Sequence, residues 1–207
     1  MVNVRPRAGG FGGSGTVSGL LASVLLVPVL LVSVLLTAAI FGFFYAWVCS
    51  TMWGLDAADP RIAIPAMQAM NASVRNVVFA PAFFATPFAL ALTAVLARAH
   101  RLPRAALLFG AAALVYAGGA LAPTLLVNVP MNETLALVTV PADLSEARAI
   151  WTAYSGTWQA WNLARTVASG IALLLAVGGV AAVARDSVNR LAIARPQPAT
   201  PVAGAVA

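Results

Sequence analysis

Two short segments of the chain carry residue types that could bind a planar anion. The first is the amide-containing segment Asn128-Val-Pro-Met-Asn132. The second is a series of residues at steps of three or four: Trp151, Tyr154, Trp158, Trp161 or Asn162, and Arg165. Helical residues at such steps form one stripe, so aromatic faces, an amide and a guanidinium would share a surface. That chemistry suits a flat, partly anionic aromatic molecule such as a polyphenol.

Each part of this pattern also has a structural explanation. Trp and Tyr favour the membrane interface, which explains the outer half of the stripe as well as binding does. Asn is common at helix ends, and we expect that role for one of the two Asn residues beside Pro130. The inner half, with Trp158, Asn162 and Arg165, favours function, because Asn and Arg facing lipid are costly.

A third segment adds Asn71 and Arg75, which follow Gln68 at helical spacing and therefore share its face. We expect the amides of Asn71 and Asn132 and the guanidinium groups of Arg75 and Arg165 to surround one cavity. Two cations near one mouth require a neutralising partner. The candidates are an anionic ligand and the acids Glu133 and Glu146.

Composition places these residues in a membrane protein. Of 207 residues, 61% are hydrophobic and 9% are charged, whereas a soluble domain has about a quarter charged residues. The length allows one bundle without a separate soluble domain. All 12 basic residues are Arg, which indicates GC-rich coding and a bacterial source. A nucleic-acid partner is not expected, because no basic face is interleaved with aromatics.

Cofactor sites of several classes are excluded by residue counts. Cys49 is the single cysteine and His100 the single histidine. These counts exclude a disulfide within the chain, a CxxC redox pair and a metal site of clustered His or Cys. A Ser-His-Asp set is not expected either, because His100 lies on the opposite side from the polar connections. Ligation by carboxylates or amides stays open, so the metal is unknown. The glycines of residues 9–13 follow no strand and form no phosphate loop.

Four apolar runs predict four membrane-spanning helices. They cover about residues 20–48, 77–97, 105–127 and 166–184. We expect a bend near Pro28. Pro81 and Pro87 should kink the second span and free carbonyls that neighbours or a ligand must satisfy. Gly110, Gly118 and Gly119 should let a neighbouring helix approach the third span closely.

Polar connections occupy residues 50–75 and 128–164. Asp59 and Pro60 predict the cap and first position of a short helix that lies along the membrane surface. Asp143 and Glu146 predict a capped helix start that continues into the fourth span, with a weak point at Gly156.

The predicted fold is therefore all-α: an integral membrane four-helix bundle with a short interfacial helix in the first outside loop and a helical extension of the fourth span. Residues 20–186 form the membrane domain, between disordered tails at residues 1–19 and 187–207. Arg residues concentrate in both tails and in the turn between spans two and three, whereas five of six acids lie in the connections. The positive-inside rule then places both termini in the cytoplasm, in a multi-pass protein of the inner (plasma) membrane.

Three segments of the chain resemble the anthrone oxygenase-like family, also known as domain of unknown function DUF1772. They are residues 63–71, ending in Asn71; residues 128–135, with Asn-x-Pro-x-Asn; and residues 158–166, with Trp-x-x-Trp-Asn-x-x-Arg. The resemblance covers about residues 35–185, and the last two motifs are fairly specific as a pair.

The resemblance implies an activity. Characterised members of that family oxidise polyketide anthrones to anthraquinones with molecular oxygen and no known organic cofactor, while many bacterial members have no assigned activity. The family motif carries over to Asn71, Asn128, Asn132, Trp158, Asn162 and Arg165.

We therefore expect an oxygenase that acts on a lipophilic, phenolic or polyketide-type aromatic substrate, with molecular oxygen as co-substrate and no organic cofactor. The general base is Glu133 or Tyr154. The residues expected to act in catalysis are Arg165, Asn132, Asn162 and Glu133. Those expected to bind the substrate are Asn71, Arg75, Asn128, Tyr154, Trp158 and Trp161.

Two other functions fit the same residues. One is a non-catalytic binding or transport protein for a small lipophilic molecule, and the other is a structural partner of other membrane proteins. The expected partners are the aromatic substrate and the lipid bilayer, and the sequence predicts no oligomeric state.

Overall fold

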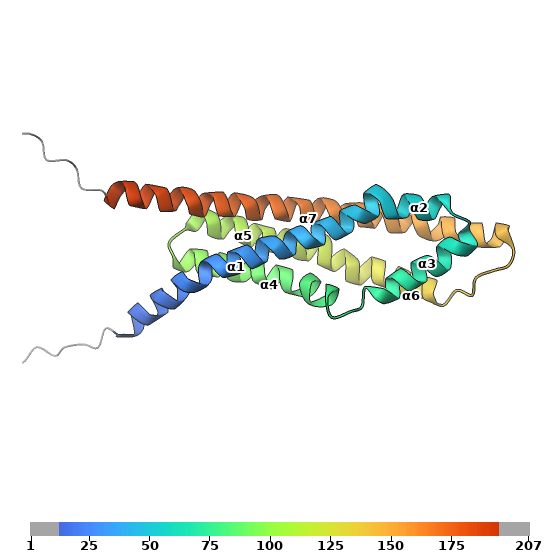
Figure 1. Cartoon of the computed structure of the whole chain (residues 1–207), viewed down its shortest axis with the longest axis horizontal. Coiled ribbons are helices and arrows are strands. Elements are labelled where there is room, and N and C mark those ends of the chain that lie inside the picture. The colour runs from blue at the N-terminus through green and yellow to red at the C-terminus, as the bar shows by residue number, and fades with distance from the viewer. Residues whose placement is uncertain (1–12, 195–207) are drawn as a thin grey trace, which may run out of the picture.

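Four helical runs, each long and apolar enough to cross a membrane, lie side by side in the computed structural model of the chain (Figure 1). The structure describes the backbone of residues 13–194 and the side chains of residues 25–189. The runs are Leu25–Ala57, Phe79–Ala99, Pro103–Ala136 and Leu144–Asn189. The prediction of an all-α bundle with four spans is confirmed.

The first run is longer than predicted. Helix α1 (Gly13–Ala46) continues through a π-helical turn, η1 (Trp47–Thr51), into α2 (Met52–Ala57). Pro28 lies inside α1 without ending it. Helix α1 begins within the predicted N-terminal tail, of which residues 1–12 lie outside the described residues.

The third run also extends past its predicted end. Helix α5 (Pro103–Tyr116) is followed by two π-helical turns, η2 (Ala117–Leu121) and η3 (Thr124–Asn128), and then by α6 (Val129–Ala136). The expected capping role of an Asn beside Pro130 is therefore wrong for Asn128, which makes no side-chain capping bond. The wide turns keep the backbone helical around prolines that lack an N–H.

The second and fourth runs are the helices α4 (Phe79–Ala99) and α7 (Leu144–Ala194). Pro87 lies inside α4, and the Phe83 carbonyl four residues earlier accepts a 3.0 Å hydrogen bond from the Tyr116 hydroxyl. A neighbour thus satisfies a carbonyl freed by proline, as predicted. Pro81 lies in the first turn of α4, where proline is tolerated.

Helix α7 is unbroken, so the predicted weak point at Gly156 is wrong. The side chains of Trp151, Tyr154 and Trp158 are buried around this position, and packing of this kind compensates the low helix propensity of one glycine. The helix starts as predicted, with the Asp143 carboxylate accepting from the Glu146 backbone N–H at 2.9 Å.

The predicted short helix is α3 (Pro60–Ser73), capped by Asp59, whose carboxylate accepts from the Arg61 backbone N–H at 2.9 Å. It packs on α6 and α7 at the end of the bundle opposite the described chain ends (Figure 1). Its position along a membrane surface stays a prediction.

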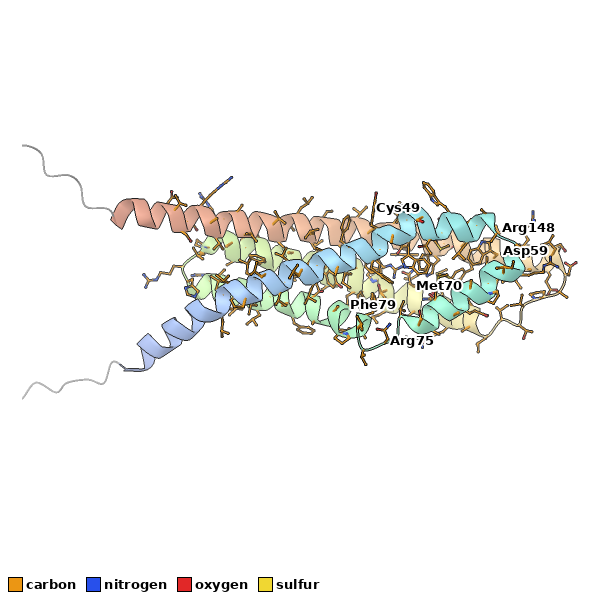
Figure 2. All side chains as sticks on the ribbon, in the orientation of Figure 1. Cys49, Asp59, Met70, Arg75, Phe79 and Arg148 are labelled. Atoms are coloured by element: carbon orange, nitrogen blue, oxygen red, sulfur yellow. The ribbon has the colours of Figure 1, made fainter. Side chains whose placement is uncertain are left out.

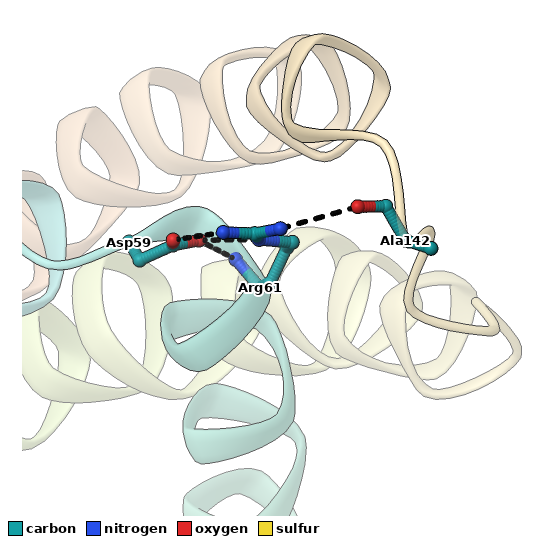
Figure 3. Close-up of polar contacts among 3 residues, drawn as sticks. All are labelled: Asp59, Arg61 and Ala142. Carbon is teal, nitrogen blue, oxygen red and sulfur yellow. Dashed lines mark hydrogen bonds and ion pairs between the residues drawn. The ribbon is translucent and has the colours of Figure 1, made fainter.

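Arg61 links the two connections. Its side chain pairs with the Asp59 carboxylate at 2.7 Å and donates to the Ala142 carbonyl at 3.2 Å (Figure 3). This contact lowers the pKa of Asp59 from 3.8 to about 2, because the ionised form receives the hydrogen bonds from Arg61.

Close helix contacts hold the half of the bundle nearer the chain ends. A Cβ added at Gly119 would lie 2.5 Å from the Ala168 Cβ, and one added at Gly179 would lie 2.6 Å from the Phe109 ring. The predicted close approach is therefore present at Gly119, while Gly118 has open space. The other half holds a separate aromatic core that includes Trp47, Trp151, Tyr154 and Trp158.

Candidate functional site

A cavity of about 330 Å³ lies between α1, α4, η3 and α7, within the size range of small-molecule sites. It brings together the four polar residues expected to converge: Asn71, Arg75, Asn132 and Arg165. Figure 2 shows Arg75 and Phe79 where the connection after α3 meets the bundle. The residues of the aromatic wall are Phe43, Phe44, Trp47, Phe79, Phe83, Phe84 and Trp158.

Arg165 is the most unusual side chain of this cavity, because it is charged and only 4% exposed. Its Nη1 donates to the Thr124 hydroxyl at 3.1 Å and its Nη2 to the Asn162 amide oxygen at 3.0 Å. Its Cζ lies 4.7 Å from the centre of the Phe44 ring and 5.4 Å from that of Trp158. Both ring faces attract the cation.

These neutral partners leave the charge of Arg165 uncompensated. Within residues 25–189 no carboxylate lies within ion-pair distance of it, and its Nε has no hydrogen-bond partner. A buried cation without a counter-charge is costly, and an anion placed beside it removes part of that cost. The arrangement would therefore be stabilised by a negative group beside Arg165.

Two other amides of the cavity are held by backbone carbonyls. The Asn162 amide nitrogen donates to the Phe44 carbonyl at 3.1 Å, just before the π-helical turn of the first span. The Asn128 amide nitrogen lies 3.5 Å from the Trp158 carbonyl, while the Asn128 amide oxygen is buried without a partner among the described residues. Asn128 and Arg165 thus each keep one buried polar atom without a partner in the part of the chain that the structure describes, and both residues line the same cavity.

Asn132 is oriented by two donors. Its amide oxygen accepts from the Tyr154 hydroxyl at 2.7 Å and from the Trp158 indole N–H at 2.9 Å. Asn71 in turn donates to the Tyr154 oxygen at 3.3 Å. Because both donors occupy the oxygen of Asn132, its NH₂ group is left to donate to a ligand.

Glu133 neutralises Arg75, one of the two alternatives that the sequence left open. Their side chains form a 3.3 Å ion pair, and each is 59% exposed. Glu133 does not line the main cavity; it lines a second one, of about 640 Å³, that shares Asn71, Arg75 and Asn132 with the first. The candidate base Glu133 thus lies at the rim.

The stripe on α7 is present, and it resolves one ambiguity of the sequence. Asn162, 1% exposed, faces the cavity, whereas Trp161 is 39% exposed and absent from the cavity wall. The expected stacking wall from Trp161 is therefore wrong, since neighbouring helical residues point about 100° apart. Trp47 of η1 takes that place, with its ring centre 5.1 Å from that of Trp158.

Sequence reasoning also missed Thr124 and Asp56. Thr124 precedes Asn128 by four residues on the wide turn η3, and that spacing is a signal for a shared face. Asp56 of α2 accepts hydrogen bonds of 2.6–2.9 Å from Trp151, Ser155 and Gln159, which follow one another at four-residue steps. Those steps mark a polar face that runs beside the aromatic stripe.

The described residues contain no group of three His, Cys, Asp or Glu side chains placed to hold a metal ion. The family model for anthrone oxygenase matches residues 68–175, just over half of the chain. No curated protein and no solved structure matches the chain. The matched range contains every polar residue of the cavity but leaves out the aromatic wall from the first span.

Proposed function

The chain belongs to the anthrone oxygenase family, and on this premise we propose that it is a membrane-embedded oxygenase of lipophilic phenolic aromatics. The observation that carries the proposal is the buried guanidinium of Arg165, which lines an aromatic cavity and lacks a carboxylate partner among the described residues. Such a group favours the anionic form of a bound phenol or enol over the neutral form.

Binding would use the two kinds of wall separately. The aromatic rings of the substrate pack against the aromatic wall of the cavity, and its oxyanion lies toward Arg165. The NH₂ group of Asn132 donates to an oxygen of the substrate. These donors are fixed by the protein before the substrate arrives, which is how a site stabilises charge that develops during a reaction.

The proposed reaction converts a CH₂ group beside an aromatic ketone system into a carbonyl. Loss of one proton gives the enolate, which passes one electron to molecular oxygen. The resulting radical and superoxide combine at the same carbon to form a C–O bond and a peroxide. Loss of the second C–H proton with cleavage of the O–O bond releases water. The sum is CH₂ plus O₂ giving C=O plus H₂O.

The first proton needs an acceptor, and we assign this role to Glu133. It lines the second cavity, which shares Asn71, Arg75 and Asn132 with the first, so one water molecule could relay the proton. Tyr154, the other candidate base, already uses its hydroxyl to donate a hydrogen bond to Asn132. Its hydroxyl instead orients the amide that faces the substrate.

Oxygen uptake tests this proposal. The purified protein in lipid vesicles receives anthrone, and an oxygen electrode and absorbance follow O₂ and anthraquinone. We expect one O₂ consumed per anthraquinone formed, above the rate of protein-free vesicles and of heat-denatured protein. Binding of anthrone without uptake would overturn the proposal and favour a binding or transport protein, which flux of anthrone between vesicles would then identify.

We also propose that the protein lies in a bacterial inner membrane with both termini in the cytoplasm. The turn Arg98–Arg104 lies at the same end of the bundle as the described chain ends, while Asp56, Asp59 and Glu133 belong to the opposite end (Figure 1). A reporter fused after Ala207 should be active in the cytoplasm. An exported C-terminal reporter would contradict this orientation.

A further inference from the structure

The wall of the main cavity continues onto the outer surface of the bundle. Phe84 of α4 and Leu125 of η3 both line the cavity, yet they are 46% and 45% exposed. Ala80, one turn before Phe84, also lines the cavity and is half-buried. The cavity is thus open between the first turns of α4 and the turn η3.

This opening lies within the membrane spans predicted from the sequence. Phe84 and Leu125 belong to two of the four helical runs that are long and apolar enough to cross a membrane. Phe84 lies five residues after the first residue of α4, which is about 7–8 Å along the helix. At that depth the solvent around an exposed side chain is lipid rather than water.

The opposite side of the cavity is polar. Asn71, Arg75 and Asn132 separate it from the second cavity, and the exposed ion pair between Arg75 and Glu133 lies there. An apolar ring system that came from water would have to pass these charged and amide groups. The same groups suit water and protons instead.

We propose that the lipophilic aromatic substrate reaches the cavity from within the bilayer, through the lateral opening bounded by Ala80, Phe84 and Leu125. This inference rests on the proposed function, because it takes the cavity to be the substrate site. The phenolic oxygen leads, since Arg165 lies on the inner wall, and the rings follow between the aromatic residues. The polar cavity serves the exchange of protons and product water.

Two matched pairs of variants test the route. Ala80→Leu adds bulk at the opening, and Ala85→Leu adds the same bulk at an exposed position of α4 outside the cavity wall. Phe84→Ala widens the opening, and Phe88→Ala, at a side chain 72% exposed one turn later, does not. Both controls face lipid, where such changes are tolerated.

The measurement is stopped-flow binding of 2-naphthol to the protein in vesicles, followed by quenching of the native Trp fluorescence, to which Trp47 and Trp158 of the cavity wall contribute. We expect Ala80→Leu to slow association and dissociation by about five-fold or more, with Kd unchanged within about two-fold, because an opening affects both rates equally. Phe84→Ala should accelerate both rates. Ala85→Leu and Phe88→Ala should match the wild type.

Wild-type rates in Ala80→Leu, or equal slowing in Ala85→Leu, would overturn the lateral route. Slowing confined to Glu133→Gln would place the route at the polar cavity instead. If 2-naphthol binds through the lateral opening while anthrone causes no oxygen uptake, the proposed oxygenase function fails and the route stands. If the wild type shows uptake but no dependence on Ala80 or Phe84, the route alone fails.

Discussion

Asp56, which packs against helix α7, and Arg165, which belongs to it, are satisfied in opposite ways. Asp56 is exposed, yet its two carboxylate oxygens accept from Trp151, Ser155 and Gln159. Arg165 is buried, yet its described partners are a hydroxyl, an amide oxygen and two aromatic faces. The exposed carboxylate of Asp56 thus accepts three hydrogen bonds, whereas the buried guanidinium of Arg165 has no counter-ion among the described residues.

This difference separates a structural contact from the proposed binding site. A carboxylate with three fixed donors has little capacity left for a ligand, so Asp56 serves to join α2 to α7. A buried guanidinium without a carboxylate partner among the described residues keeps an uncompensated charge, which an anion in the cavity could offset. Substitutions at the two positions should therefore affect different properties, activity at Arg165 and stability at Asp56.

The largest expected effect is the loss of turnover in Arg165→Leu. Removal of a group that stabilises a developing oxyanion costs about 10²-fold or more in rate. The bundle should remain folded, because leucine suits an aromatic cavity wall and removes an uncompensated charge. Oxygen uptake with anthrone and gel filtration in detergent measure the two outcomes.

Arg165→Lys is the matched control, because it keeps the charge but loses the planar fork that reaches Thr124 and Asn162. We expect it to recover part of the activity. If Arg165→Leu aggregates while Arg165→Lys is stable, Arg165 is a structural residue. It would then not differ in role from Asp56.

The second largest effect is expected for Asn132→Asp, which adds a carboxylate to the cavity wall. Asn132→Asp keeps the acceptor for Tyr154 and Trp158 and replaces the NH₂ group with a charged oxygen. A negative charge in the cavity wall opposes an anionic substrate, so kcat/KM should fall by about ten-fold or more while the melting temperature is maintained. An unchanged kcat/KM would show that the substrate does not bind as an anion.

Trp158→Phe should lower kcat/KM less than Arg165→Leu does, because it keeps an aromatic face.

A smaller effect, on stability alone, is expected for Asp56→Asn. The single amide oxygen cannot serve all three donors, so at least one of Trp151, Ser155 and Gln159 loses its hydrogen bond to residue 56. The melting temperature in detergent should fall by a few degrees, roughly 2–6 °C. Oxygen uptake per folded molecule should equal that of the wild type. A selective loss of uptake would give Asp56 a role in the site and weaken the contrast.

The smallest effect concerns pH. The pKa of Asp59 is lowered to about 2 from 3.8, so the stability from its charge is present above pH 3.8 and is lost as the pH falls through 2. Asp59→Asn keeps the helix cap and removes the charge. It should melt about 1 °C below the wild type at neutral pH, and the gap should close near pH 2. A gap that persists below pH 2 would show that the charge is not the cause.

The half of the site that lies on α7 could be predicted from the sequence. Helical spacing placed Tyr154, Trp158 and Arg165 on one face of α7, because a helix repeats at a fixed angle and needs no distant partner to do so. Helical spacing left open whether Trp161 or Asn162 belongs to this face, because they follow Trp158 by three and four residues and both steps fit a helix. Packing decided for Asn162 by offering the Phe44 carbonyl at 3.1 Å.

The other half of the site needed the tertiary structure. Phe44, Trp47 and Thr124 come from helices distant in sequence, and no local pattern indicates which of their faces meets α7. The turns η1, η2 and η3 also shift the helical phase, so a regular 3.6-residue projection misplaces the residues beyond them. The same turns carried the first and third spans past their predicted ends at residues 48 and 127.

The sequence by itself determined the all-helical fold, the four helices long and apolar enough to cross a membrane, and most of the polar residues that line the cavity, because hydrophobicity, helical period and capping act over a few residues. The tertiary structure alone decided that Glu133 neutralises Arg75 and not Arg165, that Trp161 faces outward, and that Phe84 and Leu125 of the cavity wall are partly exposed. These outcomes depend on which faces of separate helices meet. That choice is fixed by the packing of all four helices together, through close contacts such as Gly119 on Ala168.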